Sequence, residues 1–100
     1  MADDLQKTIS RLNGETARIS WQELERHYAR GVLMNVDPEL DLVMVAAHMV
    51  RDDKTAIEAY LDAGQLRPTT DEDARDWGDR DPTLWAAVVA PWVLVQERNG

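Results

Sequence analysis

Two pairs of residues in this sequence have a spacing that lets side chains on one helix share an ion or a proton. Glu23 and His27 are four residues apart, as are His48 and Asp52, and positions i and i+4 are neighbours on a helix surface. If the two helices faced each other, His27 and His48 could bind one divalent metal together with the acids. The competing interpretation places each pair on a solvated polar face, where it contributes weak ion pairing. We therefore keep the four residues as polar-site candidates.

The sequence contains no recognisable catalytic motif. Its five glycines and two histidines form no phosphate-binding loop, no GxSxG and no HExxH. Ser10 and Ser20 are the only serines, and cysteine is absent, so the usual covalent nucleophiles are nearly exhausted. The acidic run 71–81 lacks the alternating ligands and the final glutamate of a calcium loop. We assign no catalytic, cofactor-binding or metal-ligating residue, and the sequence favours a protein that is not an enzyme.

Three of the four tryptophans are candidates for contact with a partner, because tryptophan is enriched at binding hot spots. Trp21 is predicted to lie in the core. Trp77 stands in an acidic stretch and is either a helix anchor or an exposed contact. Trp85 and Trp92 flank Pro91 and, by strand alternation, lie on opposite faces of a sheet unless the proline shifts the register.

The elements that must position these residues are predicted from periodicity and end signals. Ser20, Glu23, Ile19 and Leu24 form a capping box with a hydrophobic staple, so a helix begins at Trp21. Helices are expected over residues 4–18, 21–30, 37–51 and 53–63, with the last one turning Ile57, Tyr60 and Leu61 inward, and a fifth short helix follows Thr70. Strands are expected over 32–36, 65–67, 84–89 and 92–96. The alternative for residues 82–90 is a helix that ends before Pro91.

Length and composition bound the fold and the partners. The 100 residues, of which 44% are hydrophobic, suit one globular domain. The predicted fold is α+β, with about five helices packed against a small sheet whose main strand is the C-terminal apolar segment. A net charge of -8 disfavours nucleic acid, because binding to phosphates depends on Lys and Arg. The apolar segment 84–96 is shorter than the about 20 residues of a membrane-spanning helix, and "MADDLQK" is unlike a secretory signal. We expect a cytoplasmic protein without a membrane or nucleic-acid partner.

Four stretches resemble a family of small bacterial proteins described as domain of unknown function 2288. They are "LNGETARISWQELERHYARG", "DLVMVAAHMVRDD", "AYLDAGQLRPTT" and "DPTLWAAVVAPWVLVQER". The resemblance implies a single-domain bacterial protein and supplies no activity, cofactor or catalytic residue.

Two hypotheses of function follow. The first is an interaction or regulatory module with an unknown protein partner or with itself, as a homodimer that covers the apolar C-terminal segment. The alternative is a small-ligand or metal-dependent enzyme that uses the His/Asp/Glu cluster between the second and third helices.

Overall fold

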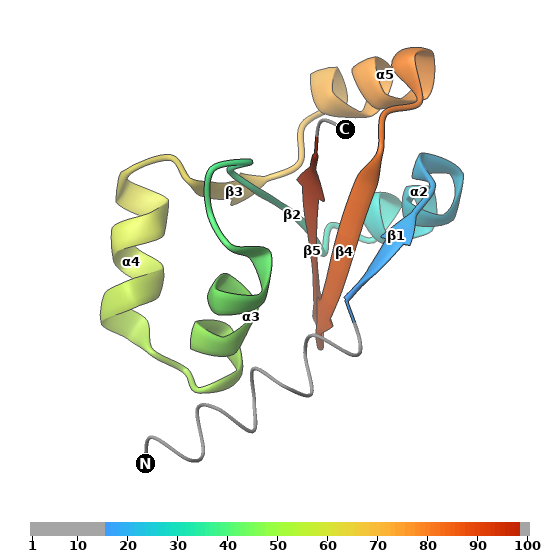
Figure 1. The fold of residues 1–100 in the computed structure, drawn as a ribbon. Helices are drawn as coiled ribbons and strands as arrows, with labels where there is room; N and C mark the ends of the chain where they lie inside the picture. Colours follow the sequence, from blue (N-terminus) through green and yellow to red (C-terminus); the bar gives the residue numbers. More distant parts are fainter. Residues whose placement is uncertain (1–15, 99–100) are drawn as a thin grey trace.

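The computed structural model describes residues 16–98, and within them five strands form one mixed sheet in the order β1-β4-β5-β2-β3 (Figure 1). The strands are β1 (Ala17–Ile19), β2 (Leu33–Val36), β3 (Leu66–Pro68), β4 (Leu84–Val89) and β5 (Trp92–Glu97). β5 is the central strand, paired antiparallel with β4 and parallel with β2, while β1 and β3 pair antiparallel with β4 and β2. The C-terminal apolar segment thus supplies two inner strands of the sheet.

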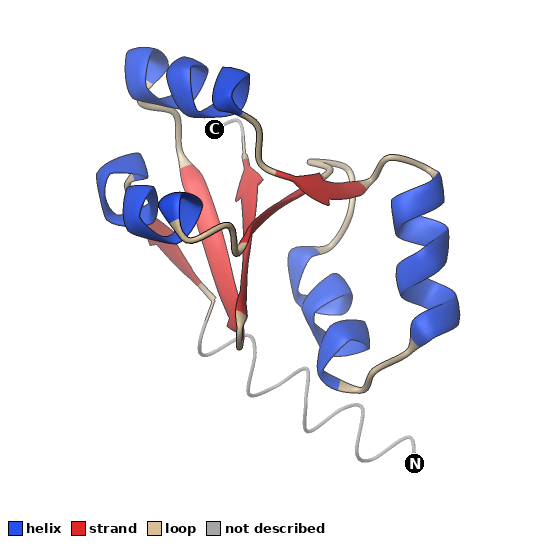
Figure 2. Ribbon diagram, turned by 180° about the vertical axis from the view of Figure 1, so that it is seen from behind, coloured by secondary structure: helices blue, strands red, loops and turns tan. Residues whose placement is uncertain are grey.

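Two pairs of helices cover the two faces of this sheet, which confirms the α+β class (Figure 2). The helices are α2 (Trp21–Ala29), α3 (Leu42–Val50), α4 (Lys54–Asp62) and α5 (Asp71–Arg80). α3 and α4 lie on one face, and α2 and α5 lie on the other. Four helices stand in the described residues where about five were predicted. No helix of residues 16–98 has the length and apolar character needed to cross a membrane.

Alternation along β4 and β5 explains why the C-terminal segment is apolar on consecutive positions. Successive side chains of a strand point to opposite faces of the sheet. Ala87 and Leu94 therefore enter the core under α3 and α4, whereas Leu84, Val93 and Val95 enter the core under α2 and α5. A strand buried on both faces needs a continuous apolar run, and this confirms the strands predicted over 84–89 and 92–96.

Pro91 lies in the turn of the β4–β5 hairpin and does not bend a strand. Val89 pairs with Trp92, and the Ala90–Pro91 peptide bond is cis. The helix considered for residues 82–90 is wrong. Trp85 and Trp92 would lie on opposite faces of an uninterrupted strand, but the two-residue turn at Pro91 reverses the chain and places both side chains on the face covered by α3 and α4.

The capping box predicted at the start of α2 is present. The Glu23 backbone N–H donates to Ser20 Oγ at 3.2 Å, and the Ser20 backbone N–H donates to Glu23 Oε2 at 3.3 Å. The helix ends before Gly31, whose φ of 74° lies in the left-handed region that glycine adopts without strain. Thr70 caps α5 in the same way, with Asp73 as the reciprocal partner.

The helix predicted over 37–51 begins later, at Leu42, with Asp41 as its N-cap. Residues 37–40 instead form a turn in which the Leu40 N–H donates to the Asp37 carbonyl at 3.0 Å. Gln96, which is buried in β5, donates from Nε2 to the carbonyls of Asp37 and Leu40 at 2.8 and 2.7 Å. This contact from a distant part of the chain holds the turn and overrides the local Asp-Pro signal.

Two further expectations about helices differ from the structure. Of the helix predicted over 4–18, residues 4–15 lie outside the described residues, and Ala17 and Arg18 belong to β1, where they pair with β4. Leu61 was expected to point inward but is 46% exposed. Ile57 and Tyr60 alone pack against the core under α3 and α4.

Candidate functional site

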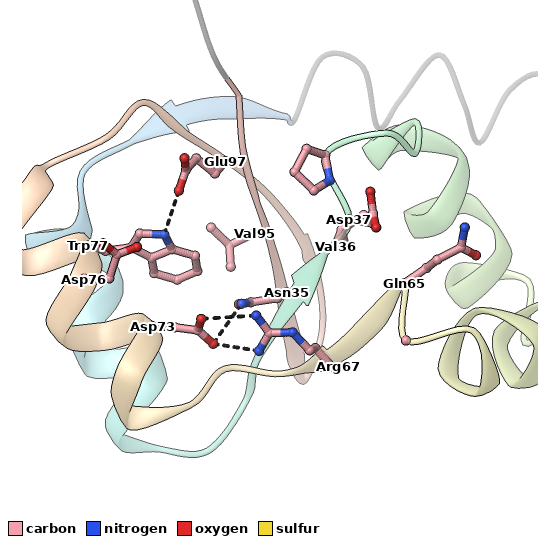
Figure 3. Close-up of a pocket in the computed structure, with 12 residues that line it drawn as sticks. Asn35, Val36, Asp37, Gln65, Arg67, Asp73, Asp76, Trp77, Val95 and Glu97 are labelled. Atoms are coloured by element: carbon pink, nitrogen blue, oxygen red, sulfur yellow. Dashed lines mark hydrogen bonds and ion pairs between the residues drawn. The ribbon is translucent and has the colours of Figure 1, made fainter.

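A polar cavity of about 290 Å³ opens where the parallel strands β2 and β5 end (Figure 3). In sheets that contain parallel strands, ligands commonly bind beyond the carboxyl ends of those strands. β2, β3, α5 and β5 all contribute side chains to the cavity. Its polar lining consists of Asn35, Asp37, Gln65, Arg67, Asp73, Asp76, Trp77 and Glu97.

One wall of the cavity is a hydrogen-bonded cluster around Asp73. Arg67 of β3 donates two hydrogen bonds to the Asp73 carboxylate, at 2.7 and 3.1 Å. Asn35 of β2 donates from Nδ2 to Asp73 Oδ2 at 3.0 Å and accepts from Thr69 Oγ1 at 2.6 Å. The Thr70 backbone N–H donates to the same carboxylate at 2.9 Å. This cluster fixes the first turn of α5 against the sheet.

These contacts keep the Asp73 carboxylate ionised. The hydrogen bonds from Arg67 lower the pKa of Asp73 from 3.8 to about 2, against the opposing effect of burial, and Thr70 adds to the lowering. The same pairing raises the pKa of Arg67. The charge of Asp73 is therefore satisfied within the protein and is not available to a ligand.

The second wall joins α5 to β5. The Trp77 indole Nε1 donates to Glu97 Oε1 at 3.1 Å. Arg80 bridges Glu97 Oε1, at 2.7 Å, and Asp76 Oδ2, at 2.6 Å, and its guanidinium lowers the pKa of both carboxyls. One guanidinium thus holds two carboxylates in place at the cavity, so this wall keeps an excess of negative charge.

On the third side of the cavity, some polar side-chain atoms have no hydrogen-bond partner within residues 16–98. Asp37 follows β2 directly, and its Oδ1 accepts the Glu39 backbone N–H at 2.8 Å. Its Oδ2 and the side-chain amide of Gln65 make no hydrogen bond within residues 16–98. Figure 3 shows both residues across the cavity from Trp77 and Asp76. The free capacity for hydrogen bonding lies on this side.

The charges around the cavity do not balance. Asp37, Asp73, Asp76 and Glu97 line it with carboxylates. Arg67 lines it too, and Arg80 reaches Asp76 and Glu97 from outside. Four carboxylates against two guanidiniums leave a negative field, and such a field in a concave site concentrates cations.

The four polar-site candidates from the sequence do not meet in the structure. His27 is on α2 and His48 on α3, and these helices lie on opposite faces of the sheet (Figure 2). The His/Asp/Glu cluster hypothesised between these two helices is therefore not formed. Glu23 serves the capping box of α2. No group of three or more His, Cys, Asp or Glu side chains in residues 16–98 is placed to hold a metal ion.

His48 and Asp52 have separate surroundings near the end of α3. His48 Nδ1 is 2.9 Å from the Tyr60 hydroxyl, a hydrogen bond that joins α3 to α4. Burial raises the pKa of Tyr60, with Asp53 and Asp41 adding to the effect. Asp52 follows the helix with a φ of 55°. His48 therefore links two helices and does not line the cavity.

The three tryptophan candidates have different environments. Trp77 is 5% exposed and packs against the Trp21 ring at 5.7 Å between centroids, so it anchors α5. Trp85 is half-buried, with the guanidinium of Arg98 4.8 Å from its ring centroid. Trp92, beside the hairpin turn, is 38% exposed.

Comparison with known proteins identifies the family. The model of the family described as "Protein of unknown function (DUF2288)" matches residues 7–97. The chain belongs to this family. A solved structure, titled "NMR solution structure of PA1075 from Pseudomonas Aeruginosa", shares 47% identity and a TM-score of 0.80, covering 97% of this chain and 87% of the other. No curated protein matches the chain. The resemblance seen in the sequence is confirmed, and the family brings no assigned activity.

Sequence reasoning missed most of the cavity. Asn35, Asp37, Gln65, Arg67 and Asp73 were read as strand, cap or surface residues, and they come together only through the sheet order. One local signal existed, because Asn35 interrupts an otherwise apolar strand, and a buried polar side chain needs a partner.

Proposed function

We propose that the protein is an interaction module that binds a cationic side chain of a partner protein in the cavity at the end of β2 and β5. The uneven charge of the lining supports this proposal most directly. Asp37 has an oxygen that accepts no hydrogen bond from residues 16–98, and Asp76 and Glu97 share the guanidinium of Arg80. A lysine or arginine side chain would supply both the missing positive charge and the missing donors.

An anionic ligand fits the same cavity poorly. Among the described residues, the Arg67 guanidinium is the only cationic group in the lining, and both of its terminal nitrogens bond to Asp73. An incoming anion would compete with Asp73 for Arg67 and would approach three further carboxylates. Repulsion between these carboxylates and an anionic ligand would therefore oppose its binding.

The expected affinity of one side chain is low. An exposed ion pair contributes about 1 kcal/mol or less, and a charge-assisted hydrogen bond contributes about 1.5–3 kcal/mol. Binding also costs rotational and translational entropy. A partner therefore needs contacts outside the cavity, which suits a reversible, regulatory association and a protein surface more than a free metabolite.

A titration with blocked amino acids tests the proposal. N-acetyl-arginine methylamide should shift the backbone amide signals of Asn35 and Gln65 and the indole signal of Trp77 in two-dimensional NMR spectra. N-acetyl-citrulline methylamide has nearly the same shape without the charge and should shift them much less. Asp37→Asn should weaken arginine binding about fivefold, the equivalent of about 1 kcal/mol.

Glu39→Gln is the matched control, because Glu39 is exposed, lies two residues away and does not line the cavity. This variant removes the same charge and should leave the titration nearly unchanged. Equal binding of the arginine and citrulline compounds would refute the proposal. So would an equal effect of the two variants, because the response would then report net charge only.

We also propose that the protein forms a homodimer through the end of the β4–β5 hairpin, where Trp92 leaves part of its ring exposed. Burying a tryptophan at a symmetric contact would stabilise such a dimer. Trp92→Ser should then lower the sedimentation coefficient at micromolar concentration. Leu61→Ser removes a comparably exposed apolar side chain from α4 and should not. A monomeric wild-type protein would exclude this contact.

A further inference from the structure

A groove of about 270 Å³ lies between α2 and β1. β1 is one edge strand of the sheet, and β3, which lines the cavity, is the other. The floor of the groove is apolar and consists of Ala17, Ile19, Ala86 and Val88. By the register of β1 and β4, these four side chains point to the sheet face that α2 and α5 cover. Val88 is 59% exposed, so the helices leave this end of the face open.

The groove is bordered by basic side chains. Arg26 and His27 of α2 stand on its rim, whereas the side chain of Arg18, which alternates with Ala17 and Ile19 along β1, points to the other face of the sheet. None of the three side chains makes a hydrogen bond or an ion pair within residues 16–98. Glu23, which also lines the groove, accepts the Ser20 N–H in the capping box. In a chain of net charge -8, two guanidiniums that have no partner within residues 16–98 therefore lie close to an apolar floor.

The strand beside the groove offers backbone groups as well. β1 pairs with β4 on one side and has no strand on its other side among the described residues. An extended peptide can add to such an edge through main-chain hydrogen bonds, while alternate side chains enter the neighbouring pocket and give specificity. The site therefore offers backbone hydrogen bonds at β1, an apolar floor and basic side chains.

We propose that this groove binds an extended peptide segment in which aliphatic residues are flanked by acidic ones. The backbone pairs with β1, and side chains two positions apart point to the same face. One aliphatic side chain therefore lies on Ala86 and Val88 and the acidic side chain two positions away reaches Arg26, while the other acidic side chain lies on the face of Arg18. Charge complementarity selects this occupant over a second copy docked by the same groove, because two copies of the basic rim would repel each other.

The test uses the full-length protein and two blocked peptides, acetyl-Glu-Val-Leu-Glu-amide and acetyl-Lys-Val-Leu-Lys-amide. At concentrations up to about 5 mM, which detects weak binding, the acidic peptide should shift the amide signals of Ala17, Arg18, Ala86 and Val88. The basic peptide should shift these signals much less. Arg26→Glu should weaken binding of the acidic peptide by about fivefold or more and strengthen that of the basic peptide.

Arg75→Glu is the matched control, because it makes the same charge change on an exposed residue of α5 that does not line the groove. This variant should keep the preference of the wild-type protein. The proposal is overturned if neither peptide shifts the signals of β1, or if Arg26→Glu leaves the preference for the acidic peptide intact. Shifts confined to Asn35 and Gln65 would also overturn it, and would place the peptide at the cavity instead.

Discussion

Replacing Asp73 with asparagine should change how the stability of the protein depends on pH. Arg67 and Thr70 lower the pKa of Asp73 from 3.8 to about 2. A shift of this size corresponds to at most about 2.4 kcal/mol. The Asp73 side chain is 19% exposed but that of Arg67 is 47% exposed, so solvent screens the pair, and we expect about 1–1.5 kcal/mol.

The sign follows from the direction of the shift. A carboxyl whose pKa is lower in the folded protein stabilises the fold fully above its unfolded pKa, and this contribution is lost as the pH falls through the folded pKa. Wild type should therefore exceed Asp73→Asn by about 1–1.5 kcal/mol in free energy of unfolding near pH 7. The difference should fall below about 0.5 kcal/mol near pH 2.

Urea denaturation followed by tryptophan fluorescence measures both proteins across this range. Asp76 and Glu97, whose pKa values are also lowered, titrate in both proteins and largely cancel in the difference. Asp79→Asn is the control, because Asp79 is exposed on the same helix and makes no hydrogen bond or ion pair within the described residues. A difference between wild type and Asp73→Asn that stays constant from pH 7 to pH 2 would refute the reasoning.

Two other substitutions test single hydrogen bonds that hold the fold. Gln96→Met should lower the free energy of unfolding by about 2 kcal/mol, because the carbonyls of Asp37 and Leu40 lose a buried donor. Gln22→Met, on the exposed side of α2, should lower it far less. Equal losses in denaturant titrations would show that the Gln96 hydrogen bonds do not stabilise the turn. Ser20→Ala should cost about 1 kcal/mol by removing the N-cap of α2, and amide exchange that is no faster in α2 than in wild type would show that the cap is dispensable.

The sequence predicts those elements whose contacts join residues close together in the chain. The capping box at Ser20 needs only residues three positions apart, so the sequence is enough to place the start of α2. The apolar run 84–96 was correctly interpreted as strands. The same run does not determine the hairpin register, because Pro91 is compatible both with a bend in a longer strand and with the two-residue turn that the structure has.

Tertiary contacts decided the rest. The Asp-Pro signal at residue 37 failed because Gln96, far along the chain, binds the carbonyls of the turn. His27 and His48 each have a spacing typical of ligands, but the sheet separates their helices. The cavity depends on bonds such as that between Asn35 and Asp73, which only the sheet order and the placement of α5 bring within reach. Periodicity carries no information on either.

The proposed function depends most on the negative field of the cavity at the ends of β2 and β5. The most direct measurement is the response of the Trp77 indole signal to a blocked arginine and to its uncharged citrulline analogue. We expect a saturable shift with arginine that weakens in Asp37→Asn but not in Glu39→Gln. An indole signal that responds alike to both compounds, or to neither, would contradict it.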